Sequence, residues 1–330
     1  MLRDILSGND SRVNASIAAI AEINPDILLL TRFDYDLGNN ALKAFSDGLM
    51  AAGAEYPHLF ALAPNSGVQT GLDLNNDGRT GSEKDAHGYG KFAGHGGMAL
   101  LSKFPIDHDA VQNFSTFPRG DLPGTLLGRD PETDPGQKSQ YRLSSVAHWD
   151  VPIMLPNGTV LRILAYHATT PVFDGPDDEN GRRNYDENMF WLQYLRGNIT
   201  YEPPTENFVI LGNANLDPND GEGRKAAIRS LLASHLVQDP KPSSPIGEVL
   251  AHTQGGANIG QFGNPALDTA DWRDDGGPGN LRVDYVLPSG ELKILDAGIQ
   301  WPAPDGVTDK LGQQGSSLSW HGLVWVDVGW

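Results

Sequence analysis

Short apolar runs that end abruptly in polar residues recur along this chain of 330 residues. Phe208–Leu211 is one such run, and its β-favouring residues predict a buried strand. The run stops at Gly212, after which Asn213, Asn215 and Asp217 alternate with other residues. A strand of this kind delivers polar groups to the edge of a sheet, where α/β proteins commonly bind ligands. Three further stretches end in a similar way: Leu161–His167, Leu281–Tyr285 and Ser319–Val326.

Helical spacing of apolar residues separates several of these runs. Residues 10–23 place Val13, Ile17 and Ile20 on one face, after a capping Asp10 or Ser11. The same patterns predict further helices at 42–49, 183–196 and 225–233, further strands at 26–30, 97–102, 142–151, 160–166, 294–299 and 323–328, and mostly loop at 64–96, 112–138 and 239–280. With no internal repeat and no dividing linker, these elements predict one domain over residues 1–330, with two packed mixed sheets covered by helices.

Composition narrows the classes of function. The chain carries 24 Lys and Arg against 42 Asp and Glu, a formal net charge of −18. Such an acidic surface disfavours nonspecific nucleic-acid binding and favours cations and small substrates. The absence of cysteine excludes disulfides, thiolate metal sites and thiol nucleophiles. No run is long and apolar enough to predict a membrane span, and the first residues do not resemble a secretory signal.

Six motifs, taken in order, resemble the endonuclease/exonuclease/phosphatase superfamily, which includes deoxyribonuclease I-like nucleases and sphingomyelinases. The resemblance runs from Ile17 to Val328, and the ordered set is more specific than any single motif. The motifs are PDILLL from Pro25, GMALLSKFPI from Gly97, AYHATTP from Ala165, ILGNANLDP from Ile210, RVDYVLPS from Arg282 and SWHGLVWV from Ser319. The resemblance implies a four-layered α/β sandwich and a hydrolase that acts on phosphoester bonds, with Mg²⁺ or Mn²⁺ at its active site.

The resemblance also implies residue roles. His321 would take a proton from the attacking water, and Asp284 would bond the other ring nitrogen and fix its orientation. His167 and Asn215 would donate to the phosphoryl oxygens, while Asn213 would help to orient the nucleophile. Two further candidates, Arg182 and Arg183, could grip a phosphate as bidentate donors.

Three positions depart from the family pattern. Arg32 stands near the place of the Glu that holds the metal, where Asp34 or Asp36 could replace it after a small shift. Asn213 stands in place of an Asp, and Trp320 stands in place of the Asp that precedes the last histidine. The family also usually opens with a strand that ends in an Asn on the metal side, which this chain begins too late to contain. Phosphate binding is therefore better preserved than metal binding.

A second pattern resembles the first half of a calcium-binding loop. Oxygen-bearing side chains stand at positions 1, 3 and 5, followed by the glycine that makes the sharp turn at position 6. Position 12 is Lys84 rather than Glu, so Glu83 or Asp85 would have to serve instead. The loop is expected to be an inserted calcium clamp within residues 73–85, and the alternative is a turn rich in Asx residues. Its residues are Asp73, Asn75, Asp77, Gly78 and Arg79.

The resemblance therefore implies a metal-dependent phosphodiesterase or phosphatase, and we expect it to act on a small or lipid-like phosphoester. The replacements at 32, 213 and 320 favour an alternative, a catalytically inactive, calcium-stabilised binding protein on the same fold. A weaker third hypothesis is a carbohydrate- or surface-associated module, suggested only by Trp residues and Gly-rich loops. Calcium affinity in the micromolar range or weaker suits a secreted or periplasmic protein, which sets the expected location.

Overall fold

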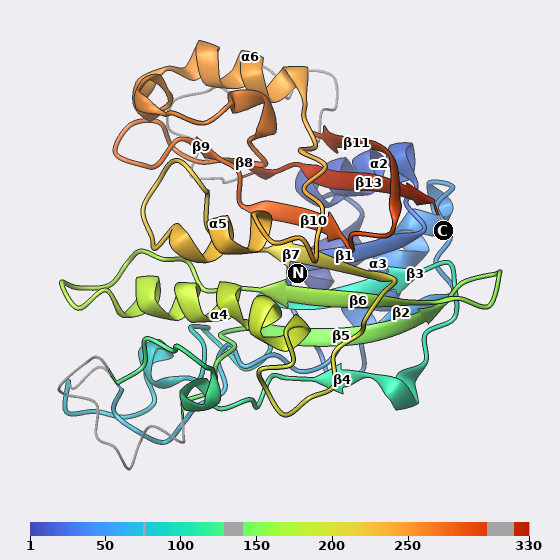
Figure 1. Ribbon diagram of the computed structural model, residues 1–330. Coiled ribbons are helices and arrows are strands. Elements are labelled where there is room, and N and C mark those ends of the chain that lie inside the picture. The colour runs from blue at the N-terminus through green and yellow to red at the C-terminus, as the bar shows by residue number, and fades with distance from the viewer. Residues whose placement is uncertain (75–76, 129–140, 302–319, 330) are drawn as a thin grey trace.

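The computed structural model of the chain describes residues 1–74, 77–128, 141–301 and 320–329. Its elements stack as helices, sheet, sheet and helices, so the predicted four-layered α/β sandwich is confirmed (Figure 1). Within the described ranges the helices are α1 (Leu2–Ser7), α2 (Ser11–Ile23), α3 (Asn40–Ala51), α4 (Glu179–Leu195), α5 (Ala226–Leu232) and α6 (Pro245–Gln254).

The first sheet contains three antiparallel strands in the order β1-β3-β2. Leu28, Ala99 and Leu101 on its outer face form one apolar cluster with Phe45 and Leu49 of α3. Burial of that face orders the N-terminal helices, because apolar surface removed from water stabilises by about 25 cal/mol per Å². The bounds are β1 (Ile27–Phe33), β2 (His58–Phe60) and β3 (Gly97–Ser102).

The second sheet has five strands in the order β10-β7-β6-β5-β4. Strands β6 and β7 are parallel and the other neighbours are antiparallel. Helices α4 and α5 cover its outer face, where Leu164, Tyr166 and Ile210 pack against Phe190 and Ile228. The bounds are β4 (Gln112–Asn113), β5 (Ala147–Met154), β6 (Val160–His167), β7 (Phe208–Asn213) and β10 (Asp284–Pro288).

The two sheets pack face to face. Phe60 and Leu100 of the first sheet share a cluster with Trp149, Ile163 and Val209 of the second. Strands that are buried on both faces read as continuous apolar runs. This explains why β3 and β7 are visible in the sequence as apolar runs without strict alternation.

The C-terminal part adds two small sheets. Strand β13 pairs with β11, and β12 pairs with β8, which in turn pairs with β9. The expectation of mostly loop over 239–280 is wrong at α6, where Ser244 caps the helix by accepting a hydrogen bond from Ile246 N. Among the described helices, none is both long and apolar enough to cross a membrane. The bounds are β8 (Ala270–Asp271), β9 (Asn280–Leu281), β11 (Lys293–Gln300), β12 (Trp320–His321) and β13 (Leu323–Gly329).

Candidate active site

Three polar residues form a row across the second sheet, at the strand ends that the sequence singles out. The parallel register sets His167 beside Asn213, and the antiparallel register sets Asn213 beside Asp284. Because the ends of β6 and β7 and the start of β10 lie at the same edge, these side chains converge from distant parts of the chain.

His321 joins this row through Asp284. The His321 Nδ1 atom lies 2.7 Å from Asp284 Oδ2, so the hydrogen bond expected from the motifs is present. The other carboxylate oxygen, Oδ1, accepts from Asn213 Nδ2 at 2.8 Å. Thr269 Oγ1 donates to Oδ2 at 2.9 Å and itself accepts from the backbone N–H groups of Val283 and Asp284. The carboxylate is therefore fixed by three neighbours, and it fixes the imidazole in turn.

Local backbone geometry explains why the two positions beside the row are a glycine, Gly212, and an asparagine, Asn215. Gly212 has φ 149°, and a Cβ there would lie 1.9 Å from the carbonyl oxygen of Tyr166, so only glycine allows β7 to approach β6 this closely. Asn215 has φ 48° and donates from Nδ2 to the carbonyl of Ala168 at 2.8 Å. Asparagine tolerates this left-handed conformation better than most residues. The amide of Asn215 thus links the loops that follow β6 and β7.

The imidazole of His167 is buried, and its Nδ1 atom has no hydrogen-bond partner among the described residues. Burial, together with the positive charge of Arg32 and with His321, lowers the pKa of His167 to about 3, and Asp284 opposes this shift. His167 is therefore neutral near pH 7 and offers one N–H donor. Arg32 has φ 56° at an irregularity in the pairing of β1 with β3, a conformation that non-glycine residues seldom adopt.

The buried polar face of α4 holds the loops that carry His167 and Asn215. Glu187 is fully buried and accepts from Ser145 N at 2.6 Å, Ser145 Oγ at 2.7 Å and Thr169 N at 2.6 Å. Asn184 Nδ2 donates to the carbonyls of Thr169 and Ala214. Burial raises the pKa of Glu187, and the Arg183 charge and the Ser145 and Thr169 hydrogen bonds oppose that rise. These side chains position the site without belonging to its row.

Both arginines proposed for phosphate binding have partners outside the row. Arg183 donates to the backbone carbonyls of His87, Arg142 and Leu143, and therefore ties loops together. Arg182 Nη2 lies 3.5 Å from a carboxylate oxygen of Glu179 in the first turn of α4.

The two aspartates proposed as metal ligands also have other partners. Asp36 accepts hydrogen bonds from the backbone of Gly38, Asn40 and Ala41 and so fixes the start of α3. Asp34 Oδ1 accepts from Gly96 N at 2.9 Å. Among the residues that the structure describes, no group of three His, Asp or Glu side chains is arranged to hold a metal ion.

The calcium-type loop forms a turn stabilised by its own carboxylates. Asp73 accepts from Asp77 N at 3.1 Å and Gly78 N at 2.8 Å, and Asp77 accepts from Arg79 N at 2.9 Å. These are the hydrogen bonds of an Asx-rich turn, and calcium binding stays a prediction. Asn75, which was expected at position 3 of the loop, lies outside the described residues.

Sequence reasoning missed three contributors to the site. Thr269 lies in the stretch interpreted as loop, and no motif marks it. Glu187 lies in the helix predicted over 183–196, but no motif marks it. The three-residue spacing from Asn184 to Glu187 puts both on one face of α4, and this is the signal that could have revealed them. Arg32 was noted only as a departure from the family pattern, whereas the structure sets its charge near His167.

Known proteins share this architecture. A structure of an endonuclease/exonuclease/phosphatase from Beutenbergia cavernae DSM 12333 matches 97% of this chain with a TM-score of 0.54 and 14% identity, and this chain spans 66% of that protein. A family protein from Leptotrichia buccalis C-1013-b (TM-score 0.46, 14% identity) matches 97% of this chain and 93% of its own. Sphingomyelinase C from Streptomyces griseocarneus (TM-score 0.43, 16% identity) matches 96% and 88%.

Sequence comparison points the same way. No curated protein matches the chain by sequence. Residues 5–316, however, match the sequence pattern described as the Endonuclease/Exonuclease/phosphatase family. Since this match spans nearly the whole chain, the protein belongs to the endonuclease/exonuclease/phosphatase family.

Proposed function

We propose that the protein hydrolyses a phosphoester, with His321 as the base that takes the proton of the attacking water. The observation that carries this proposal is the 2.7 Å contact between His321 Nδ1 and Asp284. A hydrogen bond at Nδ1 selects the tautomer whose Nε2 is free to accept a proton. The same carboxylate then stabilises the imidazolium that forms.

The surroundings of the dyad support a reacting group beside it. His321 Nε2 is buried and has no hydrogen-bond partner within the described ranges. A buried polar atom of this kind is stabilised by a bound water or hydroxyl. The Asp284 and His321 side chains are 15% and 21% exposed, so both are partly buried.

Phosphoryl oxygens require donors, and the row offers them. His167 is neutral and contributes one N–H donor, and the Arg32 charge lies close enough to affect its pKa. Positive charge and N–H donors aimed at one point stabilise the charge that develops on a phosphoryl group. Water attacks phosphorus as its proton moves to His321, and the leaving oxygen departs with the electrons of its former bond to phosphorus.

The residues around the dyad do not fit the donor set of a metal centre. All three neighbours of Asp284 are hydrogen-bond donors, and the position expected to carry a metal-binding Glu carries Arg32. We therefore derive no step through a metal ion. The expected dependence on Mg²⁺ or Mn²⁺ remains a prediction, as does the small or lipid-like substrate.

An inactive binding protein is the second candidate. Asn213 favours it, because its amide donates to Asp284 and cannot carry the negative charge expected at that position. The two candidates make opposite predictions for turnover.

Hydrolysis of bis-p-nitrophenyl phosphate and p-nitrophenyl phosphate separates them, with Mg²⁺, Mn²⁺ or Ca²⁺ present and absent. We expect turnover in the native chain and a loss of about 10²- to 10⁴-fold in His321→Ala, the usual contribution of a positioned base. His252→Ala, which removes an exposed histidine of α6, serves as the matched control and should keep full activity. Equal rates in the native chain and His321→Ala would refute the assignment, and no turnover in a folded native chain would favour the binding protein.

A further inference from the structure

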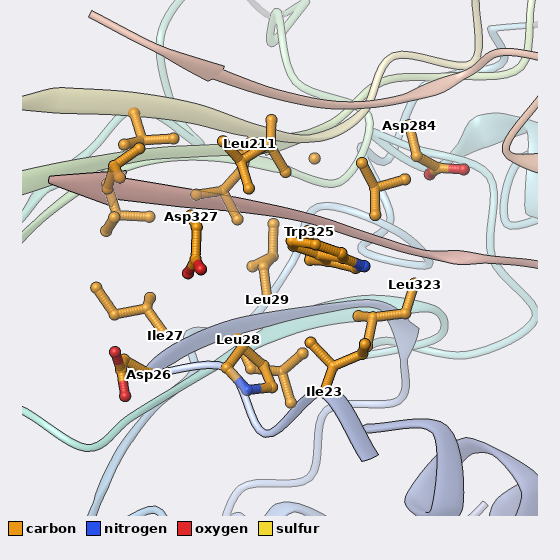
Figure 2. Close-up of a pocket in the computed structure, with 18 of the residues that line it drawn as sticks. Ile23, Asp26, Ile27, Leu28, Leu29, Leu211, Asp284, Leu323, Trp325 and Asp327 are labelled. Carbon is orange, nitrogen blue, oxygen red and sulfur yellow. The ribbon is translucent and has the colours of Figure 1, made fainter. Parts of the chain in front are cut away.

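Within the described ranges, a single hydrogen bond holds the ring of His321. Its Nδ1 atom lies 2.7 Å from Asp284 Oδ2, and its Nε2 atom has no partner there. Figure 2 shows Asp284 well apart from Asp26 and Asp327, so neither of these carboxylates is placed to share the role of Asp284. One hydrogen bond fixes the position of Nδ1 but constrains the tilt of the ring only weakly. A second contact is therefore needed to set the plane of the imidazole and the direction of Nε2.

Trp272 supplies such a contact. Its indole ring stands perpendicular to the imidazole of His321, with an interplanar angle of 85° and 5.4 Å between the ring centroids. Edge-to-face pairs at this separation are a favoured arrangement of aromatic rings and contribute more than the area that they bury. Tilting the imidazole would either open this contact or bring the two rings into a clash. Trp272 thus constrains the motion that the hydrogen bond to Asp284 leaves loose.

The strand register explains how Trp272 reaches the imidazole. In the antiparallel pairing of β8 with β12, Ala270 lies directly opposite His321. Trp272 follows two residues later and is therefore a diagonal neighbour of His321 on the same face, within reach of an aromatic side chain. The side chain of Ala270 is a single methyl group, so it does not block this approach.

Trp272 is itself held in place. Its indole packs, partly buried, against the apolar cluster that includes Leu281 and Val283. Its backbone N–H donates to the carbonyl of Gly279 at 3.4 Å, beside the pairing of β8 with β9. The indole is therefore a fixed neighbour of the imidazole and not a side chain that moves with it.

We propose that Trp272 is a positioning residue for the reaction, which sets the plane of the His321 imidazole so that Nε2 is aimed at the attacking water. This inference rests on the role of His321 as base proposed above. Thr269, from the same segment, donates to Asp284, so residues 269–272 position both members of the dyad. A base acts only when the proton that it takes lies within hydrogen-bond reach, and a small displacement costs much of the rate.

Two variants of Trp272 separate the effect of an aromatic ring from that of apolar bulk. Trp272→Phe keeps a ring, whereas Trp272→Leu keeps apolar volume without one. With bis-p-nitrophenyl phosphate, we expect Trp272→Leu to lower kcat about three- to tenfold and to leave KM within about twofold, the range that one aromatic contact supports. Trp272→Phe should keep at least about half of the native kcat. Phe262→Ala removes an aromatic side chain that is 92% exposed, and as the control it should match the native chain.

Solvent exchange of the His321 Nδ1 proton measures positioning without turnover. Proton NMR of the full chain identifies this proton as the downfield signal that is absent from His321→Ala. A ring that tilts opens its hydrogen bond to Asp284 more often. Exchange should therefore be about three- to tenfold faster in Trp272→Leu than in the native chain or Trp272→Phe.

Three results would overturn the proposal. The first is an unchanged kcat and exchange rate in Trp272→Leu, and the second is a loss in Trp272→Phe as large as that in Trp272→Leu. The third is a lower kcat in Trp272→Leu without faster exchange, which would assign the effect of Trp272 to the substrate instead. A folded native chain without turnover would refute the role of His321 as base, and the exchange rates alone would then decide whether Trp272 holds the ring.

Discussion

Replacing Asn213 by aspartate would turn the main hydrogen bond of the row into a repulsion. The Asn213 amide donates to Asp284 at 2.8 Å, in a position where the Asn213 side chain is only 1% exposed. Asn213→Asp removes that donor and sets two carboxylates against each other. The variant therefore tests whether Asn213 holds Asp284 in place and whether the site can accept a cation.

The size of the effect follows from the spacing. Two unit charges about 4 Å apart, after relaxation from 2.8 Å, repel by about 4 kcal/mol at an effective dielectric constant near 20. That free energy corresponds to about 3 pKa units, so the new carboxyl group at position 213 should keep its proton until about pH 7 instead of about pH 4. Its folded pKa is then above its unfolded pKa. Stability is therefore lost as the pH rises between the two values.

Urea denaturation from pH 4 to pH 8 measures this loss. We expect Asn213→Asp to lose about 1–2 kcal/mol relative to the native chain at pH 5 and about 4 kcal/mol above pH 7, since one pKa unit corresponds to about 1.4 kcal/mol. Adding Mg²⁺ at pH 8 should restore part of the loss, because a divalent cation offsets two adjacent carboxylates.

A double variant that exchanges the residues at positions 213 and 284 provides the control. The double variant Asn213→Asp/Asp284→Asn has one carboxylate and one amide again, so its stability should follow the native pH profile. A loss in Asn213→Asp that is the same at pH 5 and pH 8, or that persists unchanged in the double variant, would refute the electrostatic reasoning and leave a simple packing defect.

Three further predictions concern the rest of the molecule. Asp186→Ala should destabilise the fold by about 3–5 kcal/mol in urea, because it removes the carboxylate 2.7 Å from the buried Arg119 and leaves that guanidinium only Glu179, 3.2 Å away; a loss below about 1 kcal/mol would contradict this. Burial lowers the pKa of His148 to about 3, so the free energy of unfolding should fall as the pH drops from about 6.5. His148→Gln should flatten this dependence on pH by up to about 1.4 kcal/mol per pH unit. Equal slopes in the native chain and the variant would refute the prediction. If residues 73–85 bind calcium, chelator should lower the melting temperature of the native chain but not that of Asp73→Ala, and an unchanged native value would remove the calcium site.

Much of the architecture follows from local pattern. The helix from Ser11 begins after an Asp10 cap that accepts hydrogen bonds from Arg12 and Val13, as its sequence predicts. Strands β3 and β7 coincide with the expected apolar runs because strands between two layers need apolar side chains on both faces. The α6 segment was missed although Ser244 and Pro245 are a typical helix start. Its surrounding Gly and Pro residues favoured loop.

The candidate site, like the fold, depends partly on local sequence and partly on tertiary contacts. The sequence by itself determined which residues stand at the strand ends, and their order supported the link between His321 and Asp284. Only the tertiary structure decided that Thr269 and Asn213 hold that carboxylate, that Glu187 anchors the loops beside it and that Arg183 is committed to backbone carbonyls. The physical reason is that a hydrogen bond depends on distances of about 3 Å between atoms far apart in the chain, and periodicity carries no information on such distances.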